Sequence, residues 1–109
     1  MMEPRLTAGL RVAALLRRAD LAGRGAYVLR RGDDMAGAIA LGVLRPSGRA
    51  ELWSQEYDMA TDTRPWVLQA SGTPAEIDAA ATRRRAADPD LWVIELELPE
   101  DQAPGALID

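Results

Sequence analysis

The stretch that decides the fold is Asp88-Pro89-Asp90-Leu91-Trp92-Val93-Ile94-Glu95-Leu96-Glu97-Leu98-Pro99. Apolar and acidic residues alternate over its second half, and a period of two is typical of a strand with one buried face. Pro89 and Pro99 flank the run, and proline interrupts regular backbone hydrogen bonding. We therefore predict a strand over residues 91–98. Its core-facing side chains would be those of Trp92, Ile94, Leu96 and Leu98.

A helix is predicted immediately before this strand. Thr73-Pro74-Ala75-Glu76 has the pattern of a capped helix start, with Thr73 as N-cap, Pro74 in the first turn and Glu76 reaching back to the cap. The helix should run to about Ala87, because the residue before Pro89 is pushed out of the helical region. Its only large apolar residue is Ile77, so we expect it to bury little surface.

Four further strands are expected upstream. Their ranges are 26–31, 36–45, 49–57 and a short strand at 66–70. Short turns join the first three, which favours antiparallel pairing. In the second strand large residues alternate with Ala38, Ala40 and Gly42, so a helix could approach this small face closely. Tryptophan lies in three of the strand patterns and is expected to anchor the core, at Trp53, Trp66 and Trp92.

The first helix is predicted over residues 7–22, capped by Thr7 and ended by Gly23. One apolar stripe follows helical spacing, but the opposite side also carries apolar residues, including Leu10 and Leu21. A helix that is apolar on two sides must be covered on two sides, by a second layer of the chain or by a second subunit.

These elements predict a single α+β domain over residues 1–98. Its order is helix, three strands, a fourth short strand, helix and strand. We expect a mainly antiparallel sheet of four to five strands with both helices on one face. Residues 99–109 are expected to form a mobile tail.

The composition excludes several kinds of chemistry. There is no Cys, His or Lys among the 109 residues, which rules out thiolate and imidazole metal ligands, the Ser-His-acid triad and Schiff-base catalysis. We therefore predict no catalytic residue, no metal ligand and no cofactor.

No signal peptide is visible, and the longest uncharged apolar run, residues 35–44, is too short to span a bilayer. We expect a cytoplasmic protein without membrane contacts.

Charge is distributed unevenly along the chain. Residues 1–31 carry seven Arg and two acids, whereas residues 86–109 carry seven acids and no Arg. We expect these ends to meet, with Asp88 or Asp90 binding an arginine of the first segment through a bidentate contact. If they instead line an open cleft, the same groups could hold an anion. The candidate binding residues are Arg17, Arg18, Arg31, Asp33, Asp90 and Trp92.

The chain resembles a small bacterial family known as domain of unknown function 1491. The resemblance spans roughly positions 4–98 and rests above all on residues 88–97. Weaker matching blocks are Pro4-Arg5-Leu6, Leu15-Leu16-Arg17-Arg18, Arg31-Gly32-Asp33, Ala36-Gly37 and Trp66. The tail lacks the Asp-Arg pair that often follows in the family. The resemblance implies a compact single-domain bacterial protein and brings no activity.

The sequence therefore favours a non-catalytic protein-interaction module that acts as a homodimer. The two-sided first helix and the missing catalytic residue types support this interpretation. The alternative is a carboxylate and arginine site that binds or acts on a phosphate-bearing ligand, with or without Mg²⁺. Nucleic acid is not an expected partner, because the basic clusters lack neighbouring aromatic residues and the chain is acidic.

Overall fold

The computed structural model describes residues 7–56 and 58–107, and its elements follow the predicted order. They are α1 (Ala8–Leu21), β1 (Ala26–Arg30), β2 (Ile39–Leu44), β3 (Ala50–Gln55), β4 (Trp66–Gly72), α2 (Pro74–Ala87), β5 (Trp92–Glu97) and the 3₁₀ turn η1 (Pro104–Ala106). The predicted α+β class is confirmed.

The five strands form one sheet in the order β1-β5-β2-β3-β4. Strands β2, β3 and β4 make an antiparallel meander, and β1 is antiparallel to β5. The last strand, β5, lies parallel to β2. The prediction of a mainly antiparallel sheet is confirmed, but the expected hairpin between the first two strands is wrong, because β5 lies between them.

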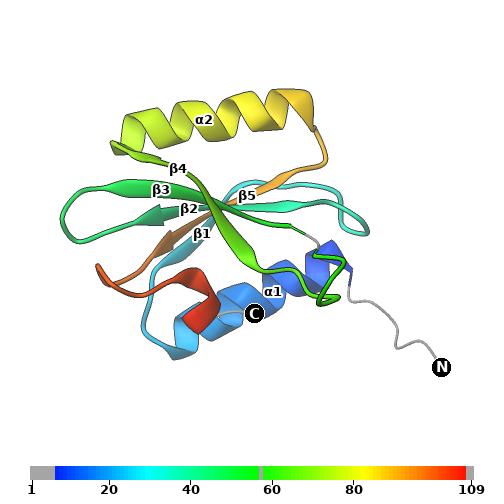
Figure 1. Cartoon of the computed structure of the whole chain (residues 1–109), viewed down its shortest axis with the longest axis horizontal. Coiled ribbons are helices and arrows are strands. Elements are labelled where there is room, and N and C mark those ends of the chain that lie inside the picture. The colour runs from blue at the N-terminus through cyan, green and yellow to red at the C-terminus, as the bar shows by residue number, and fades with distance from the viewer. Residues whose placement is uncertain (1–6, 57, 108–109) are drawn as a thin grey trace.

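The two helices cover opposite faces of the sheet (Figure 1), so the prediction that both lie on one face is wrong. The physical reason is that the central strands are apolar on both faces. In β2, Leu41 and Val43 face α1, whereas Ala40 faces α2. In β5, Ile94 faces α1 and Val93 faces α2, and both are buried.

The predicted small face of β2 is where α2 packs. The two buried residues of α2 are Ile77 and Ala81, which pack in a cluster with Ala40, Ala50 and Val93. The predicted capping box is present, since Thr73 Oγ1 accepts from Glu76 N at 3.2 Å and Thr73 N donates to Glu76 Oε1 at 3.0 Å. A helix with so little apolar surface depends on such small neighbours, because they let its backbone approach the sheet.

Helix α1 buries one side and exposes the other. Ala8, Val12, Leu15 and Ala19 face the core. On the opposite side, Leu10 is 57% and Leu21 is 72% exposed, so the described residues do not cover that side. As predicted, Thr7 caps the start and Gly23 adopts a left-handed conformation, with φ of 70°, after the end.

Within residues 7–56 and 58–107, no helix is long and apolar enough to cross a bilayer.

Enlarging a small residue under α2 should destabilise the fold. We expect Ala40→Leu to lower the free energy of unfolding by about 1–3 kcal/mol, because it overpacks the contact with α2. Ala14→Leu, at an exposed position on α1, is the matched control and should change stability by less than about 0.5 kcal/mol. Urea unfolding measures both values, and equal effects would contradict the described packing.

Candidate functional site

The six predicted binding residues do not form one site. Arg31, Asp33, Asp90 and Trp92 meet where β1 ends and β5 begins. The first turn of α1 touches this region, since Gly9 N donates to Asp34 O at 2.8 Å. Arg17 and Arg18 lie in the later turns of α1, about 12 Å farther along the helix axis at 1.5 Å per residue.

Trp92 and Asp33 are joined by hydrogen bonds that fix the loop after β1. The Trp92 indole N–H donates to Asp33 O at 2.8 Å, and Asp33 N donates to Asp90 O at 3.0 Å. The Asp33 carboxylate accepts from the backbone N–H groups of Met35 and Ala36, at 3.1 and 2.8 Å. The Asp33 carboxylate therefore bonds the backbone of its own turn, and its role is structural.

Two glycines let the same backbones approach closely. A Cβ on Gly32 would lie 2.2 Å from Asp90 O, and one on Gly37 would lie 2.4 Å from that oxygen. Neither has a positive φ. Close backbone approach, and not a left-handed conformation, therefore requires glycine at both positions. The blocks Arg31-Gly32-Asp33 and Ala36-Gly37 hold the start of β5 by close backbone contact.

Arg31 lies on the outside of this loop. Its guanidinium donates to Asp34 Oδ1 at 3.0 Å and lies 5.3 Å from the centroid of the Trp92 ring. The expected bidentate contact from Asp88 or Asp90 to Arg31 is not formed, since Asp88 Oδ1 accepts from Asp90 N instead. The two ends of the chain do meet, but the packing of α1 against β5 joins them.

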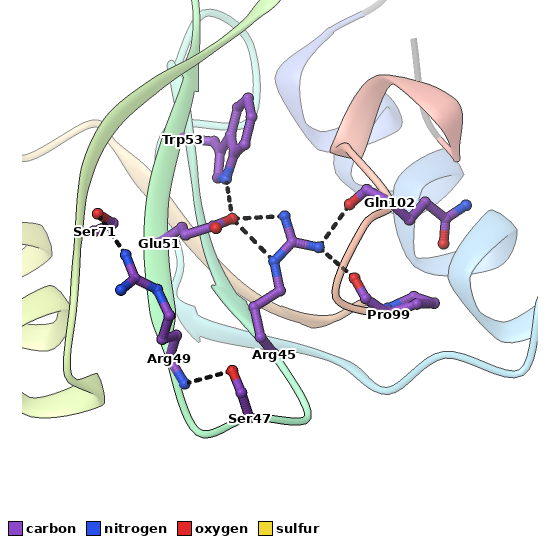
Figure 2. A network of polar contacts seen from close by, with 8 residues as sticks. All are labelled: Arg45, Ser47, Arg49, Glu51, Trp53, Ser71, Pro99 and Gln102. Carbon is purple, nitrogen blue, oxygen red and sulfur yellow. Dashed lines mark hydrogen bonds and ion pairs between the residues drawn. The ribbon is translucent and has the colours of Figure 1, made fainter.

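A buried arginine that the sequence analysis missed forms the densest polar network (Figure 2). Arg45 follows β2 and is 8% exposed. Its Nε and Nη2 donate to Glu51 Oε1 at 3.0 and 2.6 Å, and its Nη1 donates to the carbonyl oxygens of Pro99 and Gln102, both at 2.6 Å. Trp53 Nε1 also donates to Glu51 Oε1, at 2.9 Å.

This network attaches the C-terminal segment to the sheet. In residues 99–107, Pro104 is buried and Leu107 packs against the core cluster under α1. The expected mobility of residues 99–109 stays a prediction that amide exchange would measure. Because both carbonyl acceptors belong to the segment's backbone, Arg45 can hold it whatever side chains it carries.

The charge on Glu51 is stabilised by its partners. Burial opposes ionisation, but hydrogen bonds from Arg45 and Trp53 outweigh it and lower the pKa of Glu51 below its ordinary value.

A pocket of about 460 Å³ lies beside Arg45 and is lined by Arg24 and Glu97 among others. Arg24 and Glu97 are opposite in charge, and the charge of Arg45 is already paired with Glu51, so the pocket has no net charge that would select a ligand.

The described part of the chain also lacks a group of three or more acidic side chains that could hold a metal ion. The alternative of a carboxylate and arginine site would be favoured by a single pocket that holds Arg17, Arg18, Arg31, Asp33 and Asp90. Their separation into two regions removes the geometric support for that alternative.

Adding a methyl group at Gly32 should strain the loop. We expect Gly32→Ala to lower the free energy of unfolding by about 1–3 kcal/mol, because the Asp90 backbone must shift. Gly105→Ala meets nothing within 4 Å and serves as the control, with a change below about 0.5 kcal/mol. Both values come from urea unfolding, and an unaffected Gly32→Ala variant would mean that the approach is looser than described.

The lowered pKa of Glu51 gives a testable pH dependence. Its stabilising effect is present above its unfolded pKa of about 4.3 and is lost as pH falls through the lower folded value. Glu51→Gln should therefore be less stable than wild type at pH 7, with the difference shrinking below about pH 4. Thermal unfolding between pH 7 and 3 measures this, and a difference between the two proteins that stays constant over this range would contradict it.

Comparisons with known proteins place the chain in a family. The family model described as "Protein of unknown function (DUF1491)" matches residues 6–105. A crystal structure of a DUF1491 family protein from Caulobacter crescentus CB15 is 38% identical, covers 86% of this chain and 89% of its own, and has a TM-score of 0.79. The solution structure of protein Atu0922 from A. tumefaciens is 32% identical, with coverage of 96% and 93% and a TM-score of 0.79.

An NMR structure of a DUF1491 family protein from Caulobacter crescentus CB15 is 35% identical and covers 94% of both chains, with a TM-score of 0.79. No curated protein matches the chain significantly. The family resemblance noted in the sequence is thereby confirmed over nearly its whole span: the chain belongs to the DUF1491 family of proteins of unknown function.

Proposed function

We propose that the protein is a non-catalytic interaction module that forms a homodimer through the outer edge of β1. The observation that carries this proposal is the exposure of three consecutive apolar residues on that strand. Tyr27 is 58% exposed, and Val28 and Leu29 are each 40% exposed. Runs of exposed apolar residues are uncommon on folded surfaces unless they bind something.

The backbone of β1 supports the same proposal. Within the described residues β1 pairs with β5 on one side only, so it is an edge of the sheet. An edge strand presents N–H and C=O groups that can bond a further strand. The bulge between Val28 and Arg30 limits that edge to a short stretch. Twofold pairing at this edge occupies it in both copies, so it gives a closed dimer and not an open series of copies.

A second copy of the chain is a suitable partner for this edge. Two copies of β1 can pair antiparallel about a twofold axis at Val28, because the same patch then serves both subunits. Tyr27 of one copy would lie opposite Leu29 of the other, and Val28 opposite Val28. This pairing extends the sheet and covers all three exposed apolar side chains.

Charge also fits a second copy. In the antiparallel pair, Arg30 of one copy would lie across from Ala26 of the other. Glu97 of β5 lies next to that end of β1, since Glu97 N donates to Gly25 O at 2.9 Å. Gly25 has no side chain that would cover the Glu97 carboxylate. Arg30 of one copy would therefore lie near Glu97 of the other copy at both ends of the paired β1 strands.

The exposed side of α1, which first suggested a dimer, is a weaker candidate surface. Leu10 and Leu21 are eleven residues apart, about 16 Å along the axis. Arg17 lies between them and is exposed. Single exposed apolar residues of this kind are normal on protein surfaces.

The oligomeric state tests the proposal. Light scattering after size-exclusion chromatography should give a mass near twice 11.8 kDa for the wild type. Val28→Lys places two like charges opposite each other across the twofold axis and should weaken the dimer about tenfold or more. Leu68→Lys is the matched control on β4, the other edge strand, where Leu68 is 47% exposed, and should leave the mass unchanged.

Two results would overturn the proposal. One is a wild type that remains at the monomer mass up to high concentration. The other is a Val28→Lys variant that keeps the dimer mass. Circular dichroism checks that the variants are folded, and Tyr27→Glu repeats the test at a neighbouring position if Val28→Lys is unfolded.

A further inference from the structure

Two arginines and a tryptophan gather on the α1 face of the sheet, far from β1 in strand order. Arg11 lies in α1, Gln55 ends β3, Arg64 precedes β4 and Trp66 begins β4. We refer to these four residues as the arginine–indole cluster. Figure 1 shows the segment between β3 and β4 beside the first turns of α1, which is how the topology brings them together.

Gln55 connects the members of the cluster. Its Oε1 accepts a hydrogen bond from the Arg11 guanidinium, and its Nε2 donates to Arg64 O at 3.1 Å. The register of β3 and β4 places Gln55 directly opposite Trp66. Side chains of such cross-strand partners lie about 5 Å apart at Cβ. The amide of Gln55 therefore has three neighbours: the Arg11 guanidinium, the Arg64 backbone and Trp66.

The cluster carries positive charge without a matching acid. Among the described residues, neither Arg11 nor Arg64 forms an ion pair. Burial and the positive charge of Arg64 together lower the pKa of Arg11. The nearby carboxylate of Asp58 accepts from Ala60 N at 2.9 Å within its own turn. The partly buried Arg11 and the exposed Arg64 repel each other unless an anion lies between them.

The indole of Trp66 adds a donor that lacks an acceptor. The indole N–H groups of Trp53 and Trp92 donate to Glu51 Oε1 and Asp33 O. Trp66 Nε1 is shielded from solvent and has no hydrogen-bond partner in the described structure. Buried donors are nearly always satisfied in folded proteins, so an unpaired one on the residue opposite Gln55 needs an explanation.

We propose that the arginine–indole cluster binds an oxyanion, the carboxylate or phosphate group of a small molecule. Arg11 and Arg64 supply the charge and two sets of N–H donors, and the Trp66 indole supplies a third donor. Gln55 positions the Arg11 guanidinium and does not carry charge. Because the cluster lies on the β3–β4 half of the sheet, its function does not depend on pairing at β1.

The Trp66 indole gives a direct readout of this proposal. In ¹H–¹⁵N spectra of the full chain, we expect inorganic phosphate or acetate to shift the Trp66 indole N–H saturably at constant ionic strength. The indole signals of Trp53 and Trp92 should stay in place, since their N–H groups already have acceptors. Comparing phosphate with acetate shows which oxyanion is preferred, and Trp66→Phe assigns the signal.

Arginine variants complete the test. Arg11→Gln and Arg64→Gln should each weaken binding about tenfold, the expected cost of one charge-assisted contact. Arg17→Gln is the matched control, because it removes an exposed arginine from the same helix as Arg11. The proposal is overturned if the Trp66 signal does not move with either anion, or if Arg17→Gln weakens binding as much as Arg11→Gln. Chemical-shift dispersion confirms that each variant is folded. If Arg11→Gln is unfolded, Arg64→Gln still tests the proposal, because Arg64 is exposed.

Discussion

The burial of β5 on both faces is the constraint on which the rest of the structure depends. Trp92, Val93 and Ile94 are each at most 4% exposed, although their side chains point alternately to opposite sides of the sheet. A strand with two apolar faces must be covered twice, and only helices on both sides achieve this in a chain of 109 residues. The opposite placement of α1 and α2 follows from that requirement.

Much of this fold could be predicted, since local signals decide local structure. The capping box at Thr73, the alternation in β5 and the small face of β2 each determined an element or a contact correctly. The side on which each helix packs could not be predicted this way. Ala40 was expected on a small face that a helix could approach, but no local signal showed that α2 covers this face while α1 covers the other. Which strands become neighbours depends on pairing between distant segments, which no local window contains.

The candidate site shows the same division. Asp33, Asp90 and Trp92 lie near one another because they flank adjacent strand ends, whereas Arg17 and Arg18 lie farther along α1. Arg45 was missed because nothing in its sequence neighbourhood distinguishes a buried arginine from an exposed one. Its partners lie 6 to 57 residues away. Trp66 was expected to anchor the core. Its N–H lacks a hydrogen-bond acceptor, and this could not be predicted because it depends on the positions of the surrounding backbone atoms.

The position of the last strand has a consequence for how the chain acquires its structure. Strands β1 and β2 come early, yet the space between them is filled by residues 92–97. The facing edges of β1 and β2 therefore have no partner until residues 92–97 have been synthesised. Such long-range closure raises the mean sequence separation of contacts, which slows folding. On the ribosome, the nascent chain would expose these two unpaired strand edges until residues 92–97 emerge, which is the interval in which an assisting chaperone would matter.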